Sequence, residues 1–241
     1  AYEFLNNTFQ DPLLKNVLCG SSLKMELDKD TLPLYTFAQG NNSFIESSWR
    51  LKGDGSLLVD SLINDIRSMG GDVICNAGVE ELIEKDGRLV AALTVNGDRY
   101  EADWFISDTH PAVTVDLVKE SSKIKKVFRR RIHSLANTYG MYTVSLIIKP
   151  DTLKYFNWNQ YIYKKPNVWT YYLDNEPVSG ILVCCRVPED GSPYTRYVDI
   201  VTPMPWEKVA QWEGTKVGQR GEAYRAFKEI KADECIALAE T

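Results

Sequence analysis

The chain has 241 residues and a formal net charge of −5, and 44% of its residues are hydrophobic, 25% charged and 11% aromatic. This composition is typical of a folded globular protein, and it excludes intrinsic disorder, a collagen helix and a coiled coil. The mildly acidic balance argues against general nucleic-acid binding, which needs a basic surface.

No stretch of the sequence is suited to crossing a membrane. The longest stretch without Asp, Glu, Lys or Arg covers residues 132–148, which is too short and too polar for a bilayer. The five cysteines include no C-x-x-C pair, so no zinc or other metal site and no thioredoxin-like redox site is expected. We expect reduced thiols in a cytoplasmic protein. Because the sequence starts at Ala1 and stops inside a helical pattern, we expect an excised piece of a longer protein.

The first 52 residues mix short apolar runs with Asn, Asp and Pro, and they predict a helical or loop-rich segment. A helix is predicted to follow, with Ser56 as its N-cap and a pair of glycines, at 70 and 71, as its stop. Its apolar face comprises Leu58, Leu62, Ile66 and Met69.

A strand-rich block comes next. Asp86-Gly87 and Asn96-Gly97 are strong signals for tight hairpin turns, so the strands around them are predicted to form a meander. The predicted strands are residues 72–75, 79–84, 88–95, 98–101 and 104–106.

The second half of the chain predicts a helical region at 112–135 and then a strand in which successive side chains alternate between two faces. One face has Tyr142, Val144, Leu146 and Ile148; the other has Met141, Thr143, Ser145 and Ile147. Further strands are predicted at 161–163, 169–173, 181–187 and 197–201, and helices at 207–212 and 221–240. The apolar stripe of the last helix is Ala223, Phe227, Ile230 and Ala237. This order predicts a mixed α/β (α+β) chain that crosses between two domains.

Catalytic motifs are scarce, and no catalytic residue is assigned. The sequence has no G-x-S-x-G motif, and we interpret its two histidines, His110 and His133, as structural or solvent-facing. Adjacent carboxylates such as Glu80-Glu81 point to opposite faces of a strand, which does not suit a glycosidase. Gly53-Asp54-Gly55 lacks the third glycine of a dinucleotide-binding motif, because position 58 is Leu, so a turn into a helix is favoured over a phosphate cradle.

A basic run precedes the alternating strand. Its cations are Lys123, Lys125, Lys126, Arg129, Arg130 and Arg131. A solvated helix face is the simpler interpretation of this run. The functional alternative is peripheral contact with an anionic membrane surface, which would help an enzyme that collects an apolar lipid.

Aromatic residues are dense between positions 155 and 172. They predict either a sheet core with amphipathic rings at its edge or the lining of a long apolar tunnel. The residues are Tyr155, Phe156, Trp158, Tyr161, Tyr163, Trp169, Tyr171 and Tyr172.

Two sets of motifs carry a resemblance to a known family. The first set lies between 53 and 107 and comprises GDGSLLVDSL, GGDVI, VEELI, DGRLV, NG and ADWFIS. The second set comprises TPMPW at 202–206, Trp212, Arg220-Gly221, Tyr224 and Lys228. Through these motifs, residues 35–241 resemble the phytoene desaturase, carotenoid isomerase and retinol saturase-like flavoproteins of the amine-oxidase-like FAD superfamily.

The resemblance implies a fragment of a two-domain FAD-dependent oxidoreductase, with a mixed-sheet substrate domain and a β-meander piece of the FAD domain. Residues 1–52 would be a helical or loop part of the substrate domain, and 53–111 the middle segment of the FAD-binding domain. Residues 112–220 would be the substrate domain with a large mixed sheet, and 221–241 a helix returning toward the FAD domain. One cofactor contact is carried over, at Val79, whose backbone would meet the FAD adenine.

For the intact protein, the resemblance implies desaturation, saturation or isomerisation of C–C double bonds in a carotenoid- or retinoid-like isoprenoid, with hydride transfer at the flavin. The fragment itself would not bind FAD, because it lacks the pyrophosphate site. Two alternatives stay open. One is an amine-oxidase-like flavoenzyme that acts on a polar amine and needs a carboxylate or an aromatic cage. The other is a non-catalytic binding module of the same fold.

Overall fold

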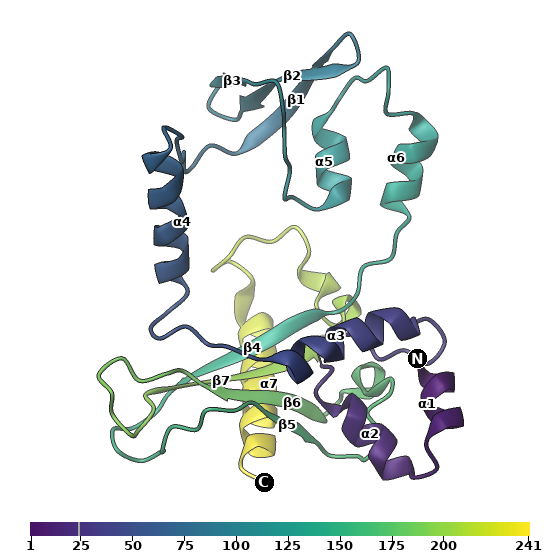
Figure 1. Cartoon of the computed structure of the whole chain (residues 1–241), viewed down its shortest axis with the longest axis vertical. Helices are drawn as coiled ribbons and strands as arrows, with labels where there is room; N and C mark the ends of the chain where they lie inside the picture. Colours follow the sequence, from purple (N-terminus) through teal and green to yellow (C-terminus); the bar gives the residue numbers. More distant parts are fainter. Residues whose placement is uncertain (24) are drawn as a thin grey trace. The chain divides into compact units, whose positions relative to one another are not determined.

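The computed structural model describes residues 1–23 and 25–241, and its contacts divide the chain into two compact units. The first unit combines Ala1–Gly55 with Thr138–Thr241, and the second unit is Ser56–Asn137. Within the described residues the chain is a mixed α+β protein with seven α-helices and two antiparallel sheets, of three and four strands (Figure 1). None of the described helices combines the length and the hydropathy needed to cross a membrane. The assignment of segments to FAD and substrate domains stays a prediction.

The sheet of the second unit is the predicted meander. Strands β1 (Val79–Lys85), β2 (Arg88–Thr94) and β3 (Arg99–Glu101) pair antiparallel in that order. The Asp86-Gly87 turn has φ values of 53° and 76°, as a type I′ turn requires. Gly97 in the next turn has a φ of 85°. Both hairpin predictions are confirmed.

Helix α4 (Ser56–Ser68) ends where the glycine pair predicts. Gly70 has a φ of 82°, and the Gly71 N–H donates to the carbonyl of Ile66 at 2.9 Å. This left-handed residue after the last turn is the usual way in which a glycine ends a helix.

The predicted apolar face of α4 is exposed. The helix buries none of its residues, and the exposed fractions are 53% for Leu58, 54% for Leu62, 40% for Ile66 and 78% for Met69. Helix α4 therefore has the sequence pattern of an amphipathic helix, but its apolar face is not packed against a core.

Two predicted strands of the second unit are wrong. Residues 72–75 and 104–106 are irregular, and Trp104 and Ile106 are 84% and 98% exposed. Both segments are short and apolar, but neither meets a partner strand among the described residues. Because a strand needs a partner for its backbone N–H and C=O groups, neither segment becomes one.

Residues 112–135, predicted as one helical region, form two helices, α5 (Pro111–Leu117) and α6 (Lys126–His133). Between them, the Ser121 hydroxyl accepts hydrogen bonds from the second and third backbone N–H groups that follow it. The Glu84 carboxylate of β1 accepts hydrogen bonds from the hydroxyl of Ser121 and from the hydroxyl and N–H of the next serine. These hydrogen bonds hold the pKa of Glu84 below its usual value and organise the loop.

The sheet of the first unit has the strand order β4-β7-β6-β5. Its strands are β4 (Gly140–Ile147), β5 (Gln160–Tyr163), β6 (Gly180–Cys185) and β7 (Tyr197–Met204). Every neighbouring pair is antiparallel, so the predicted mixed sheet is wrong. The links from β5 to β6 and from β6 to β7 contain no α-helix, whereas a parallel pair needs a long crossover that is usually helical.

The alternation predicted for β4 is confirmed. Tyr142, Val144 and Leu146 pack with the core that lies under α7 (Gly221–Ala239), whereas Ile147 is 78% exposed. Helix α7, drawn in yellow, lies across one face of the sheet (Figure 1).

Another predicted strand is wrong. Residues 169–173 do not form an extended strand, because Thr170 has a left-handed φ of 58°, and the chain continues as a 3₁₀-helix, η1 (Tyr171–Asp174).

The helix predicted at 207–212 is replaced by two short 3₁₀-helices. The two 3₁₀-helices that replace it are η2 (Trp206–Lys208) and η3 (Ala210–Trp212).

Helices α1 (Tyr2–Thr8), α2 (Pro12–Gly20) and α3 (Leu34–Glu46) lie together beside one end of the four-stranded sheet (Figure 1). Trp169 is at their centre and is 3% exposed. Its ring contacts aromatic rings of α1 and α3, with 5.1 and 6.4 Å between ring centroids. The first unit therefore has a second core, separate from the one under α7.

The apolar stripe predicted for α7 is wrong, because the buried face of the helix is a different one and includes a lysine. The helix buries Lys231, Cys235 and Leu238, whereas Ile230 of the predicted stripe is 57% exposed. A lysine can occupy a buried face only if its charge is paired.

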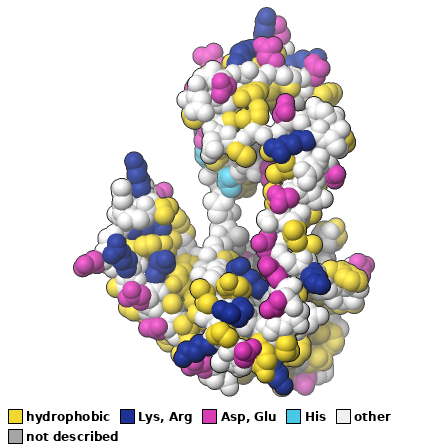
Figure 2. Space-filling view, turned by 90° about the vertical axis from the view of Figure 1, so that its left-hand side faces the viewer, with side chains coloured by type: hydrophobic (Ala, Val, Ile, Leu, Met, Phe, Trp, Pro, Cys, Tyr) yellow, Lys and Arg dark blue, Asp and Glu magenta, His cyan; other side chains and the backbone are white. Residues whose placement is uncertain are grey.

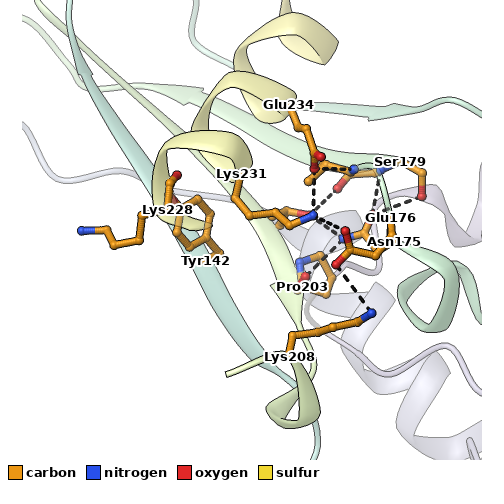
Figure 3. Close-up of polar contacts among 12 residues, drawn as sticks. Tyr142, Asn175, Glu176, Ser179, Pro203, Lys208, Lys228, Lys231 and Glu234 are labelled. Carbon is orange, nitrogen blue, oxygen red and sulfur yellow. Dashed lines mark hydrogen bonds and ion pairs between the residues drawn. The ribbon is translucent and has the colours of Figure 1, made fainter. Parts of the chain in front are cut away.

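Lys231 is paired in an ion network (Figure 3). Its ammonium group donates to Glu176 and to Glu234, the latter at 2.9 Å, and its side chain is 4% exposed. Glu234 also accepts a hydrogen bond from the N–H of Val178 at 3.0 Å. Burial alone would lower the pKa of Lys231, but the hydrogen bonds to the two carboxylates outweigh it and raise that pKa.

We expect Lys231→Ala to lower the free energy of unfolding by about 2–4 kcal/mol, because it leaves Glu234 without a cation and Glu176 with only the more distant Lys208. Urea denaturation measures the loss. Since the folded-state pKa of Lys231 is raised, the charge contributes fully at neutral pH, and its contribution is lost only above the ordinary lysine value of 10.5. Lys228→Ala, one turn earlier and exposed, is the matched control and should change stability by less than about 0.5 kcal/mol. Equal losses in the two variants would contradict this role.

Candidate functional site

Val79, which the resemblance places against the FAD adenine, is the first residue of β1 and pairs with Thr94 of β2. In the described part of the chain β1 is an edge of the three-stranded sheet, so its outer side has no strand partner. An edge strand offers free backbone N–H and C=O groups, which suit hydrogen bonding to a purine base. The free edge of β1 leaves room for such a contact, and the role of Val79 stays a prediction.

The structure separates one cation of the basic run, which has a structural role, from five that are exposed. Arg129 donates to the carbonyl groups of Val115 and Val118 and so ties α6 to the end of α5. The remaining cations are exposed, and none of them has an ion-pair partner among the residues described. They are Lys123, Lys125, Lys126, Arg130 and Arg131.

Both histidines have structural partners. The Nδ1 atom of His110 accepts a hydrogen bond from the N–H of Ala112 at 3.2 Å, so His110 caps α5. Its Nε2 atom then carries the hydrogen and donates to Asn137 at 3.0 Å. The Nε2 atom of His133 lies 2.9 Å from the carboxylate of Asp116. Neither ring contacts a serine or cysteine nucleophile in the described structure.

The cysteines form no disulfide, and three of them are buried. All five are free, and burial raises the pKa of both Cys19 and Cys235 to about 11, so these thiols stay protonated at neutral pH. Across residues 1–23 and 25–241, no group of His, Cys, Asp or Glu side chains is arranged to hold a metal ion.

The aromatic segment 155–172 contributes to two places, of which the first is a core. The Tyr163 hydroxyl donates to the carbonyl of Gly20 at 2.7 Å, and its ring meets Tyr171 edge-on at 5.1 Å between centroids. Burial raises the pKa of both tyrosines, which therefore stay protonated. These rings, together with Trp169, join the sheet to the N-terminal helices.

The second place is a groove of about 990 Å³ in the first unit. Tyr155, Trp158 and Tyr161 line one wall. The opposite wall is the end of α3 and the segment after it, including Phe44 and Trp49. We call this hollow the aromatic groove. Its volume lies at the upper end of the range of small-molecule sites, about 300–1,000 Å³.

Arg50 holds the two walls of the aromatic groove together. Its Nη1 atom donates to the carbonyl of Cys185 at 2.7 Å, and its Nη2 atom donates to the side-chain oxygen of Asn159. Because Cys185 is the last residue of β6, these hydrogen bonds fasten the segment after α3 to the sheet.

The lining of the aromatic groove has mixed polarity, because serine and asparagine side chains lie beside the aromatic ones. Its described lining contains no carboxylate and two cations, Arg50 and Lys52. A polar amine is positively charged at neutral pH, so these cations would repel it.

Sequence reasoning identified one wall of the aromatic groove and missed the other. The dense aromatics at 155–172 indicated either a core or a lining, and the structure contains both. The sequence predicts only that Trp49 and Arg50 belong to the helical or loop-rich first 52 residues. The only signal in this segment is a Trp next to an Arg in a stretch without periodicity. Local propensity cannot predict that this Arg binds a carbonyl group 135 residues further along the chain.

No protein-family profile matches the sequence. A search of curated proteins finds no match either.

Proposed function

We propose that the chain is part of an FAD-dependent oxidoreductase that desaturates, saturates or isomerises C–C double bonds of a carotenoid- or retinoid-like isoprenoid. The first unit would supply the substrate site, and the second unit would be a middle piece of the FAD domain. The motifs at 53–107 and 202–228 carry the resemblance on which this proposal rests.

The observation that carries the proposal is the uncovered apolar surface of the second unit. The stripe of α4 and the side chains of Trp104 and Ile106 are exposed, and Figure 2 shows hydrophobic side chains at the surface between charged ones. Fully burying a Leu or Ile side chain contributes about 1.5–3 kcal/mol, so a helix face of this kind normally has a covering layer. The missing parts of an FAD domain would supply that layer.

The residues present fit a partial FAD site. When bound, FAD supplies the redox chemistry, and the protein supplies orientation and an apolar enclosure. In this chain, the backbone of Val79 at the sheet edge would hold the adenine. The aromatic groove would bind and orient the isoprenoid and exclude water from it.

The alternatives make different demands. An amine-oxidase-like enzyme needs a carboxylate or an open aromatic cage, and the cations of the aromatic groove weigh against it. A non-catalytic binding module would use the same groove, but the full-length protein would hold no flavin.

The first test concerns the cofactor. We expect no flavin to accompany the chain through gel filtration after incubation with FAD, because Val79 is the one adenine contact and the glycine-rich pyrophosphate motif is absent. Flavin absorbance of the protein peak measures retention. Stoichiometric retention would refute the interpretation as a partial FAD domain.

The second test concerns the substrate class. We expect all-trans-retinol to bind and to quench tryptophan fluorescence, since Trp158 lies in the aromatic groove. Trp158→Ala should weaken binding about 3- to 10-fold, because one aromatic contact contributes about 0.5–1.5 kcal/mol.

Trp104→Ala is the matched control for the substrate test. Trp104 is 84% exposed and belongs to the second unit, so its loss should change the affinity by less than about twofold. Benzylamine is the competing probe, and we expect it not to bind. Saturable binding of benzylamine in place of retinol would favour the amine oxidase.

We also propose that α6 contacts an anionic membrane surface. Lys126, Arg130 and Arg131 are exposed on α6, and beside them Val127 and Phe128 are 70% and 47% exposed. Cations next to exposed apolar side chains are typical of helices that lie in a membrane interface. Such a contact would bring the protein close to isoprenoids that are dissolved in the membrane.

The third test is vesicle sedimentation. We expect binding to vesicles of phosphatidylcholine with phosphatidylserine and none to phosphatidylcholine alone. Lys126→Gln with Arg130→Gln and Arg131→Gln should weaken binding about 100-fold, since each cation near the surface contributes about 1 kcal/mol. The control, equal in charge change and distant in sequence, is Lys149→Gln with Lys154→Gln and Lys164→Gln. If both triple variants weakened vesicle binding equally, the binding would depend on net charge alone, and the proposed contact of α6 would be wrong.

A further inference from the structure

A second cavity, of about 480 Å³, lies in the first unit where α7 begins. Its wall consists of the loop before α7, the exposed face of the first turns of α7, and Tyr142 of β4. It belongs neither to the aromatic groove nor to the residues that the resemblance implies for FAD. We call it the basic cavity.

The lining of the basic cavity is cationic. It contains Arg220, Arg225 and Lys228, against a single carboxylate, Glu229. None of these four side chains takes part in an ion pair within the described residues. In a chain whose formal net charge is −5, this is a local excess of positive charge that its own carboxylates leave uncompensated.

Two tyrosines are held in place around these cations. The hydroxyl of Tyr224 accepts a hydrogen bond from Arg220 at 2.7 Å, and the Arg220 guanidinium lies 4.8 Å from the centroid of the Tyr224 ring. Trp212 packs edge-on against the same ring at 5.1 Å. The Tyr142 hydroxyl donates to the backbone carbonyl of Lys228 at 2.6 Å. Arg220 is therefore pre-positioned by contacts that do not neutralise its charge.

The start of α7 adds to the positive potential. This helix has 19 residues, and its N-cap, Arg220, makes no side-chain hydrogen bond to the first turn. Unsatisfied N–H groups and the helix dipole both favour an anion at such an end. Gly218 and Gly221 line the cavity, and their φ values of 81° and 78° let the backbone turn there without side chains in the way. The one acid of the first turn, Glu222, does not line the cavity.

We infer that the basic cavity binds the phosphoryl group of a phosphorylated small molecule. Guanidinium groups match the geometry of phosphate oxygens, and an arginine pair with a lysine provides enough charge for a dianion. The volume exceeds that of one phosphate group, so the apolar side chains of Val217 and Ala232 are left to contact an organic part of the ligand. This inference does not depend on the flavin proposal.

Calorimetric titration with inorganic pyrophosphate at low ionic strength tests the inference on the chain as it is. We expect saturable binding of one pyrophosphate per chain, weakened by added salt. Arg225→Gln with Lys228→Gln should weaken it at least about tenfold. Both side chains are exposed and Lys228 uses only its backbone toward Tyr142, so the fold should persist, as circular dichroism can verify.

The matched control is Lys216→Gln, in the same loop but outside the lining, which should change the affinity by less than about twofold. Arg225→Lys keeps the charge but loses the guanidinium geometry, so it should weaken binding less than the double variant does. Absence of saturable pyrophosphate binding by the unchanged chain would overturn the inference. So would a double variant that is folded and binds like the unchanged chain, or acetate binding as tightly as pyrophosphate.

Discussion

The first unit depends on the burial of one face of its antiparallel sheet beneath α7. Val144 and Ile200 of the sheet pack with Cys235 and Leu238 of the helix, and none of the four is more than 8% exposed. Lys231 adds a charged contact at this interface, where its paired ammonium group ties the helix to the loop before β6. The aromatic groove and the basic cavity both lie in this unit. The aromatic groove lies where the segment after α3 meets the sheet, and the basic cavity lies where α7 begins.

The second unit has a different balance of surface and core. Its sheet buries Leu82 and Ala91, yet α4 buries none of its own residues. An amphipathic helix without a partner is surface that a further layer is expected to cover. The proposed flavoenzyme would account for this surface, for the free edge of the three-stranded sheet, and for an aromatic groove whose described lining contains no carboxylate. In such an enzyme the cofactor does the chemistry, and the protein needs few reactive side chains.

Features encoded by a few adjacent residues were predictable from the sequence. The Asp86-Gly87 turn needs positive φ at both positions, and the alternation along β4 needs only a buried face, so both were confirmed. Predictions failed where a distant contact or a single backbone angle decided the outcome. Thr170 turns a strand-like run into a 3₁₀-helix. Lys231 is buried because Glu176, far away in the sequence, neutralises it, and hydropathy patterns cannot show that. The aromatic groove was half predictable, since one wall is dense in aromatics and the other is brought in by Arg50.

The division of the chain into units has a consequence for synthesis. Ala1–Gly55 and Thr138–Thr241 build one unit, and the whole of Ser56–Asn137 lies between them in the sequence. On a ribosome the second unit therefore emerges completely before the first can close. Until Trp169 is translated, the apolar side chains of the N-terminal helices lack the ring around which they pack. During that interval the nascent chain exposes two hydrophobic surfaces, the face of α4 and the unpacked side of the N-terminal helices.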